Sequence, residues 1–185
     1  MNFREKIKER IEVLHKVCEN EELIKKIIEL VYSHIKKGAK IILCGNGGSA
    51  SDSSHIAAEF IGKIKDKTKK PIPAINIGID AAVITAIAND YGFEEIFSKQ
   101  IEAIGKKNDI LIIFSTSGKS KNVSKAILKA KEIGLKIIYF TGENSPINEE
   151  LCDFVIKLPT SQKEIIQEVY MILWHIIVEK IEEKL

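Results

Sequence analysis

The sequence predicts an α/β protein: a three-layer αβα sandwich built on a five-stranded parallel sheet, with two helices before it and one long helix after it. Short apolar runs alternate with helix-length segments through most of the chain, which is the pattern of strands joined by crossover helices. The runs are apolar along their whole length, as in strands that are buried on both faces. A chain of 185 residues is long enough for one such domain.

Two helices are expected ahead of the sheet. Lysine, glutamate and isoleucine recur with helical periodicity over residues 3–18 and 20–37, with a break near Glu19 and Asn20. Gly38 follows the second segment, at the place where a glycine commonly ends a helix.

The strands are predicted from short apolar runs, each followed by glycine or polar residues. In chain order they are residues 40–44, 73–77, 109–114, 136–140 and 153–158. A polar loop over residues 65–70 precedes the second strand, and Pro159 ends the fifth.

The remaining helices lie between and after these strands. They are predicted over residues 49–63, 80–89, 94–104, 121–133 and 161–184, with Gly134 ending the fourth of them. The last helix is apolar on nearly every face between Val169 and Val178, which indicates burial on all sides. Because parallel sheets bind ligands at the carboxyl ends of their strands, the polar loops there are the candidate sites.

The charge balance excludes several classes of function. The chain has 28 basic and 26 acidic side chains and a net charge of +2, so no field of one sign favours general nucleic-acid binding. Only Arg4 and Arg10 are arginines. A phosphate site must therefore use backbone amides, hydroxyls or lysine rather than bidentate arginine.

The sequence shows no signal for export or membrane insertion. The N-terminus, MNFREKIKER, is charged, and no apolar run reaches the ~20 residues of a membrane span. Cys18, Cys44 and Cys152 stand far apart without a paired spacing, which is typical of a reducing compartment. We therefore expect a cytoplasmic protein with no nucleic-acid or membrane partner.

The segment GNGGS, residues 45–49, follows the first strand and opens a helix. It nearly matches the dinucleotide fingerprint as a GxGxxA, but the second strand ends without the acidic residue that would bind a ribose. A simple packing turn is a second interpretation. The better one is a loop that binds an anion or a sugar at a helix N-terminus.

The segment STSGKS, residues 115–120, follows the third strand. Its GKS suggests a P-loop, but position 113 is isoleucine where that motif requires glycine. Four hydroxyls and a glycine at a helix start can hold a phosphate without arginine. A solvated helix cap would need only one hydroxyl, so phosphate binding is favoured.

Two helical segments carry weaker candidates. His55 and Glu59 lie four residues apart, on one helix face, where they could hold a metal or divide acid and base roles. An ordinary solvated pair on a helix surface explains this spacing equally well. Gln167 and His175 lie on the last helix, and a lone histidine in so apolar a stretch is more often a core residue. The polar segment 89–93 is explained as well by a turn as by a site.

Four stretches together resemble one family, the bacterial phosphoheptose isomerases of the sugar-isomerase (SIS) domain. They are CGNGGSASDSSHIAAEFIGK, AIANDYGFEEIFSKQIEAIG, DILIIFSTSGKSKNV and IIQEVYMILWHII. The resemblance spans essentially the whole chain. It implies a single SIS domain over residues 1–185 with a flavodoxin-like strand order, in which residues 1–37 form a helical hairpin used in oligomerisation and residues 38–185 form the α/β core and closing helix. It also implies the conversion of sedoheptulose 7-phosphate to D-glycero-D-manno-heptose 7-phosphate, for heptose precursor biosynthesis.

The resemblance also assigns residues to roles. Glu59 and His175 match the catalytic acid/base pair. The matching ligands of one Zn²⁺ per subunit are His55, Glu59, Gln167 and His175. The residues expected to bind the sugar phosphate are Asn46, Gly47, Gly48, Glu59, Asn89, Asp90, Ser115, Thr116, Ser117, Ser120 and Gln167. The family implies a homotetramer whose active site draws on neighbouring subunits.

Two other functions stay open from the sequence. Non-catalytic SIS relatives act as partners of the bacterial replication initiator, but they lack the acid/base residues that Glu59 and His175 match here. SIS isomerases of shorter sugar phosphates usually carry extra regulatory domains, for which 185 residues leave no room.

Overall fold

The computed structural model describes residues 2–62, 65, 68 and 70–185. Its centre is a five-stranded sheet in the order β2-β1-β3-β4-β5, with every neighbouring pair parallel. The strands are β1 (Ile41–Gly45), β2 (Ala74–Asn76), β3 (Ile110–Ser115), β4 (Lys136–Thr141) and β5 (Phe154–Lys157). The predicted α/β class and flavodoxin-like strand order are confirmed.

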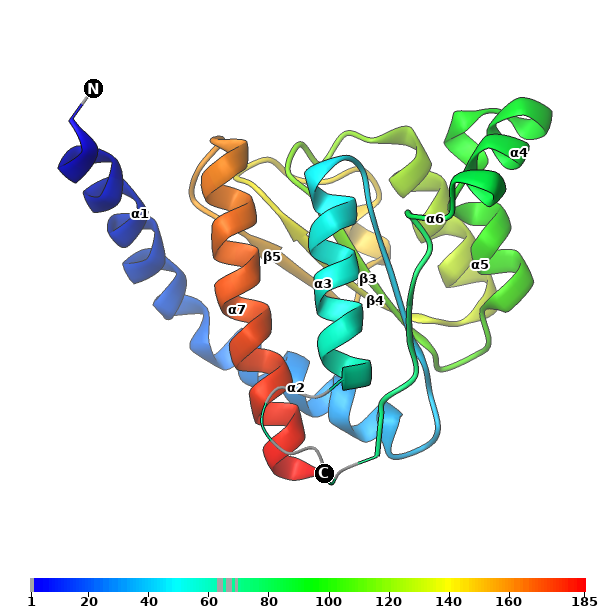
Figure 1. The fold of residues 1–185 in the computed structure, drawn as a ribbon, viewed down its shortest axis with the longest axis horizontal. Helices are drawn as coiled ribbons and strands as arrows, with labels where there is room; N and C mark the ends of the chain where they lie inside the picture. Colours follow the sequence, from blue (N-terminus) through cyan, green and yellow to red (C-terminus); the bar gives the residue numbers. More distant parts are fainter. Residues whose placement is uncertain (1, 63–64, 66–67, 69) are drawn as a thin grey trace.

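Seven α-helices surround this sheet in the described part of the chain (Figure 1). They are α1 (Phe3–Val17), α2 (Glu21–Ile35), α3 (Gly48–Gly62), α4 (Ala81–Tyr91), α5 (Ser98–Ile104), α6 (Lys121–Ile133) and α7 (Lys163–Lys184). Short 3₁₀ turns cover residues 18–20, 93–95 and 149–151. None of the described helices combines the length and apolar character that crossing a bilayer requires.

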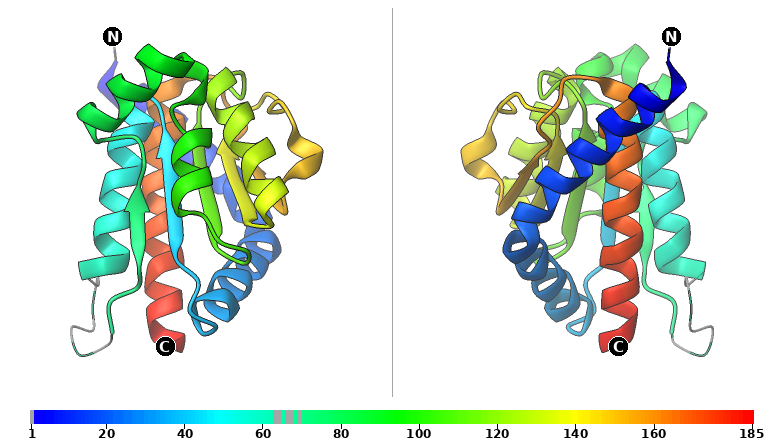
Figure 2. Two further views of the ribbon diagram at one scale, coloured as in Figure 1. Left: turned by 90° about the vertical axis from the view of Figure 1, so that its right-hand side faces the viewer. Right: turned by 90° about the vertical axis from the view of Figure 1, so that its left-hand side faces the viewer.

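Alternate residues of the strands supply two separate cores. Ile41 and Leu43 face a core shared with α2, α3 and α7, whereas Ile42 and Cys44 face one shared with α5 and α6. The period-two alternation of a strand explains this division, and burial on both faces explains why no polar residue alternates in the sequence. Figure 2 shows the helices on the two sides of the sheet, with α1 crossing α7 at an angle.

The structure differs from the sequence-based expectation at three elements. β2 has only three residues, because it is an edge strand that follows Pro71 and Pro73, and proline has no N–H to donate. The expected helix 80–89 extends to Tyr91 and stops at Gly92, whose φ is 98°. The expected helix 94–104 consists of a 3₁₀ turn and the shorter α5.

Other boundaries follow the predicted signals. Gly38 and Gly134 adopt positive φ values of 84° and 90° after α2 and α6, as helix-ending glycines do. The predicted polar loop 65–70 falls partly on residues 66, 67 and 69, which lie outside the described residues.

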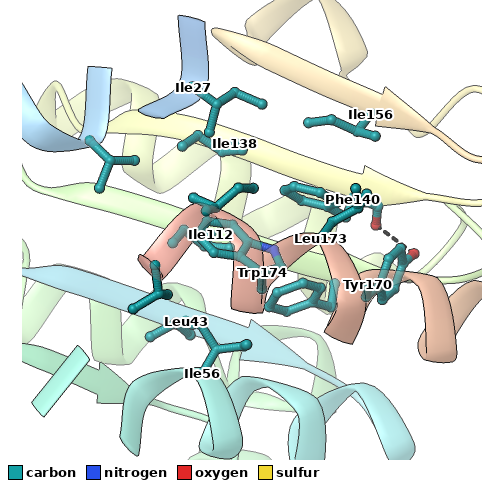
Figure 3. Close-up of a cluster of buried hydrophobic side chains, with 14 of the residues drawn as sticks. Ile27, Leu43, Ile56, Ile112, Ile138, Phe140, Ile156, Tyr170, Leu173 and Trp174 are labelled. Atoms are coloured by element: carbon teal, nitrogen blue, oxygen red, sulfur yellow. Dashed lines mark hydrogen bonds between the residues drawn. The ribbon is translucent and has the colours of Figure 1, made fainter. Parts of the chain in front are cut away.

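Aromatic side chains at the centre of the first core fix the position of α7. Trp174 is fully buried, and its ring lies 5.2 Å from that of Phe140 and 6.0 Å from that of Phe114. The Tyr170 hydroxyl donates to the carbonyl oxygen of Phe140 at 2.8 Å (Figure 3). One side of α7 is therefore locked onto β3 and β4. Its other side keeps Ile172 and Ile176 exposed in the single chain, so burial on all sides requires a further partner.

We expect Trp174→Ala to lower the free energy of unfolding by about 3–5 kcal/mol, because a large ring leaves a cavity among aromatic neighbours. Chemical denaturation measures this change. Leu128→Ala on α6 is the control, since Leu128 is 50% exposed and its loss should change stability by less than about 0.5 kcal/mol. Equal losses in the two variants would contradict the assigned core.

Candidate active site

The candidate site lies along the seam between α3 and α7. Both helices start at the carboxyl edge of the sheet, α3 after β1 and α7 after β5, so they run in the same direction side by side (Figure 1). Polar contacts join them at two levels: Gln167 to Asp52 near the start of both helices, and His175 to Glu59 about two turns further on.

Glu59 is the centre of the second of these levels, the one further from the sheet edge. Its Oε1 lies 2.5 Å from Nδ1 of His175 and 3.3 Å from Nε2 of His55. The Glu59 side chain is 14% exposed, whereas those of His55 and His175 are 56% and 45% exposed. The structure therefore places a mostly buried carboxylate between two imidazoles that solvent can reach. The alternative interpretation of His175 as a core histidine is wrong.

This arrangement suits proton transfer. An ionised carboxylate only accepts hydrogen bonds, so the nitrogens that face Glu59 are the protonated ones in neutral rings. The second nitrogen of each imidazole then remains able to accept a proton. Glu59 Oε2 is buried without a hydrogen-bond partner, which leaves one carboxylate oxygen available to a ligand.

The same three side chains fit a metal ion. One ligand atom from each of His55, Glu59 and His175 lies within 4.8 Å of the others. Two imidazole nitrogens and a carboxylate oxygen are a donor set that Zn²⁺ accepts, and the unpartnered Glu59 Oε2 is a further donor. Gln167, the fourth predicted ligand, lies about two turns nearer the N-terminus of α7 than His175, which is about 12 Å along the helix axis at ~1.5 Å per residue, and its side-chain amide donates to Asp52.

Asp52 is a site residue that the sequence analysis missed. Its Oδ2 accepts a hydrogen bond of 3.1 Å from Gln167 Nε2. Burial raises the pKa of Asp52, while the hydrogen bond from Gln167 and the charge of His55 act in the opposite direction. The signal was present: Asp52, His55 and Glu59 stand at i, i+3 and i+7, which is one face of a helix.

The glycine loop, residues 45–48, lies above this seam at the end of β1. Gly47 has a φ of 57°, which favours glycine. A Cβ on Gly48 would overlap the side-chain amide of Gln167. The first helical residue of α3 is therefore glycine because α7 approaches it closely. The Asn46 side chain pairs with that of Asn122 on α6.

The serine loop, residues 115–120, follows β3, the neighbour of β1. Gly118 adopts a φ of 68°, and Ser117 Oγ accepts a bond of 3.2 Å from the Lys119 N–H. Ser120 is the N-cap residue of α6, but its hydroxyl makes no capping bond. The interpretation of this loop as a simple solvated cap is therefore weakened, because the cap position does not use its hydroxyl.

Asn89 and Asp90 lie apart from the seam. They occupy the last turn of α4 rather than a break between helices, and Asn89 Nδ2 donates to Asp90 Oδ1 at 2.8 Å. Figure 1 shows α4 and α7 on opposite sides of the molecule. Within one chain, these two residues are thus separated from Glu59 and His175.

Comparisons with known proteins agree on one family. A sequence profile described as SIS domain matches residues 2–142. The phosphoheptose isomerase of Clostridium acetobutylicum is 43% identical over 188 residues, covering 100% of this chain and 95% of that protein. The phosphoheptose isomerase of Thermodesulfovibrio yellowstonii is 46% identical over 165 residues, covering 89% and 82%.

Solved structures give the same result. A phosphoheptose isomerase from Francisella tularensis has a TM-score of 0.92 at 28% identity, covering 99% of this chain and 100% of that one. The phosphoheptose isomerase from Neisseria gonorrhoeae has a TM-score of 0.89 at 32% identity, covering 98% and 100%.

We expect Gly48→Ala to fold, with the free energy of unfolding changed by less than about 1 kcal/mol, because the added methyl group meets only the end of a flexible side chain. A crystal structure should show the Gln167 amide displaced from Asp52. Gly62→Ala, at the far end of the same helix, meets no atom within 4 Å and serves as the control. A retained hydrogen bond between Gln167 and Asp52 would show that the Gln167 amide lies further from Gly48 than the structure places it.

Proposed function

The chain belongs to the phosphoheptose isomerases of the SIS-domain family, and we propose that it converts sedoheptulose 7-phosphate to D-glycero-D-manno-heptose 7-phosphate. The protein is accordingly a sugar-phosphate isomerase. The observation that carries the proposal is the 2.5 Å contact between Glu59 and His175, which brings an acid/base pair together from two helices far apart in the sequence.

The reaction moves one proton between C1 and C2 of the sugar and another between the two oxygens, through a cis-enediol. In our proposal Glu59 takes the carbon-bound proton as general base and returns it to the adjacent carbon. His175 moves the proton between the oxygens and can protonate the ring oxygen when the cyclic form opens. Because Glu59 is mostly buried, little water competes with substrate for its carboxylate.

The loops at the carboxyl edge of the sheet would hold the rest of the substrate. Ser115, Thr116, Ser117 and Ser120 supply hydroxyls beside the α6 N-terminus, where the helix dipole favours a phosphate. In the neighbouring glycine loop, the residues proposed to line the substrate site are Asn46, Gly47 and Gly48. Asp90 and Gln167 are proposed to position sugar hydroxyls, with Asn89 beside Asp90.

A zinc ion is proposed at His55, Glu59, Gln167 and His175. The metal would polarise the carbonyl oxygen of the open-chain sugar. Supporting this are the converging ligand atoms of His55, Glu59 and His175. Gln167 Nε2 donates to Asp52, which leaves the amide oxygen of Gln167 as its metal-binding atom.

The alternatives have weaker support. A non-catalytic partner of the replication initiator has no need of an imidazole held at 2.5 Å from a carboxylate. An isomerase of shorter sugar phosphates would use the same chemistry, so the two functions are distinguished by assaying ketose phosphates of different length.

We also propose a homotetramer in the cytoplasm. An apolar groove of about 530 Å³ lies between α1, α2 and α7, and its lining includes Ile11, Ile172 and Ile176, each at least 40% exposed. α4 has no buried residue despite its apolar composition. A second copy on these faces would cover them and could bring Asn89 and Asp90 to a neighbour's site. The three unpaired cysteines suit a reducing compartment.

The function is tested by incubating the pure protein with sedoheptulose 7-phosphate, and separately with five- and six-carbon ketose phosphates, while NMR follows the products. We expect the heptose 7-phosphate to form and the shorter sugars to react far more slowly. Turnover of a shorter sugar alone would replace the proposed substrate, and no turnover of any would exclude the function.

Glu59→Gln and His175→Gln should each lower kcat by about 10²–10⁴-fold, which is the usual contribution of general acid–base catalysis. Substrate binding, measured by calorimetry, should persist. Glu132→Gln is the matched control, because it removes a carboxylate from an exposed ion pair on α6. Parental kcat in either site variant would remove that residue from the mechanism.

Elemental analysis after zinc incubation should give about one zinc per chain. His55→Ala should weaken zinc binding at least about tenfold, since one of few ligands is lost. His34→Ala removes a histidine of α2 whose Nδ1 is bonded to the Leu30 carbonyl, and should leave zinc binding unchanged. Equal zinc affinity in the His55 variant and the parent would refute the assigned ligands.

Light scattering at micromolar concentration should give a mass near four times the 20.8 kDa chain. Ile11→Lys places a charge in the groove and should lower that mass, because a buried unpaired charge is costly. A monomeric parent protein would overturn the proposed assembly.

A further inference from the structure

A reciprocal pair of asparagine amides joins the two loops that the proposed substrate site uses. Asn46 Nδ2 donates to Asn122 Oδ1 at 3.0 Å, and Asn122 Nδ2 donates to Asn46 Oδ1 at 2.8 Å. Asn46 belongs to the glycine loop, and Asn122 is the second residue of α6, directly after the serine loop. Asn122 lies in one of the stretches that carry the family resemblance, but neither the motif spacing nor the resemblance assigns it a role.

The orientation of the pair is fixed by a third hydrogen bond. Asn122 Oδ1 also accepts from the backbone N–H of Val123 at 2.9 Å. A backbone N–H is only a donor, so the atom facing it must be the amide oxygen. The Asn122 amide nitrogen must then face Asn46, and Asn46 has only one orientation that satisfies both bonds.

Burial makes the pair specific. Asn122 is 2% exposed, so water cannot replace a lost partner, and an unsatisfied buried amide is unfavourable. β1 and β3 are adjacent, with Gly45 opposite Phe114, so the two loops leave the sheet at the same level. The amide pair thus spans the gap between loops that follow neighbouring strands.

We propose that Asn122 is a positioning residue, which holds Asn46 and the glycine loop in fixed register with the serine loop. This inference rests on the proposed isomerase function. The serine loop would bind the phosphate without Asn46, whereas the sugar carbons must also meet Glu59 and His175 below the glycine loop. Asn122 therefore affects how the sugar carbons are placed against Glu59 and His175 more than it affects the binding of phosphate.

The test compares Asn122→Ala, Asn46→Ala and the double variant. We expect each single change to lower kcat/KM for sedoheptulose 7-phosphate at least about tenfold, because small misplacements of reacting groups are costly. The double variant should lose no more than the worse single variant, since both changes break one pair. The inhibition constant of inorganic phosphate should stay within about threefold of the parent value in all three.

Asn148→Gly is the matched control. Asn148 Nδ2 donates to Ser124 Oγ on the same helix at 2.8 Å, and its φ of 62° suits glycine, so this change removes an amide bond to α6 without touching the glycine loop. It should keep parental kcat/KM. If Asn122→Ala fails to fold, Asn122→Ser replaces it in every measurement, because one hydroxyl cannot form the reciprocal pair.

Hydrogen–deuterium exchange of the backbone amides tests the same inference without measuring turnover. Residues 46–50 of the unliganded protein should exchange faster in Asn122→Ala and not in Asn148→Gly. Parental kcat/KM in a folded Asn122 variant, multiplied losses in the double variant, or unchanged exchange would each overturn the inference. A parent protein without isomerase activity would overturn the proposed function instead, and the exchange result would still decide whether Asn122 holds the loop.

Discussion

The packing of Phe60 against Trp174 is the contact on which the site depends. Their rings meet edge to face at 6.1 Å, and both side chains are fully buried. Phe60 directly follows Glu59, and Trp174 directly precedes His175. Because neighbouring residues on a helix are about 100° apart around its axis, fixing the two aromatic rings in the core also fixes where the carboxylate and the imidazole point. The apolar core thereby sets the geometry of the polar pair.

The parallel sheet supplies the other condition. Only helices that start at the same edge run in the same direction, and α3 and α7 do so after β1 and β5. Their parallel course lets contacts recur at two levels, Gln167 with Asp52 and His175 with Glu59. The contact between Gln167 and Asp52 lies nearest the loops that follow β1 and β3. The candidate site therefore extends from the carboxyl edge of the sheet along the seam between α3 and α7.

The sequence predicted much of this, and the failures have physical causes. Apolar runs and glycine signals located all five strands, because buried parallel strands leave a continuous pattern. The last helix looked apolar on every face because one side meets the core through Trp174 while the other carries Ile172 and Ile176, which are exposed in the single chain. Periodicity alone could not separate the buried isoleucines of this helix from the exposed ones. Nor could residue spacing connect His55 and Glu59 with His175, since no local sequence pattern shows which distant helices pack side by side.

Asp52 and Asn122 show the same limit in another form. Both are polar residues on helices, and each gains its meaning from a side chain on a distant element, Gln167 for Asp52 and Asn46 for Asn122. The resemblance to a known family identified the residues expected to meet substrate. It did not identify the residues that hold them in place. Helical spacing places Asp52 on the same face as His55 and Glu59, but its partner Gln167, like the partner of Asn122, is known only from the three-dimensional contacts.

The central claim, that Glu59 moves the carbon-bound proton while His175 serves the oxygens, is tested most directly by isotope exchange. Parent and Glu59→Gln proteins are incubated with sedoheptulose 7-phosphate in deuterated water, and NMR follows the hydrogens on C1 and C2. The account predicts exchange in the parent protein and none in Glu59→Gln, although that variant still binds the sugar phosphate. Exchange at the parental rate in Glu59→Gln would contradict it and assign the base to another group.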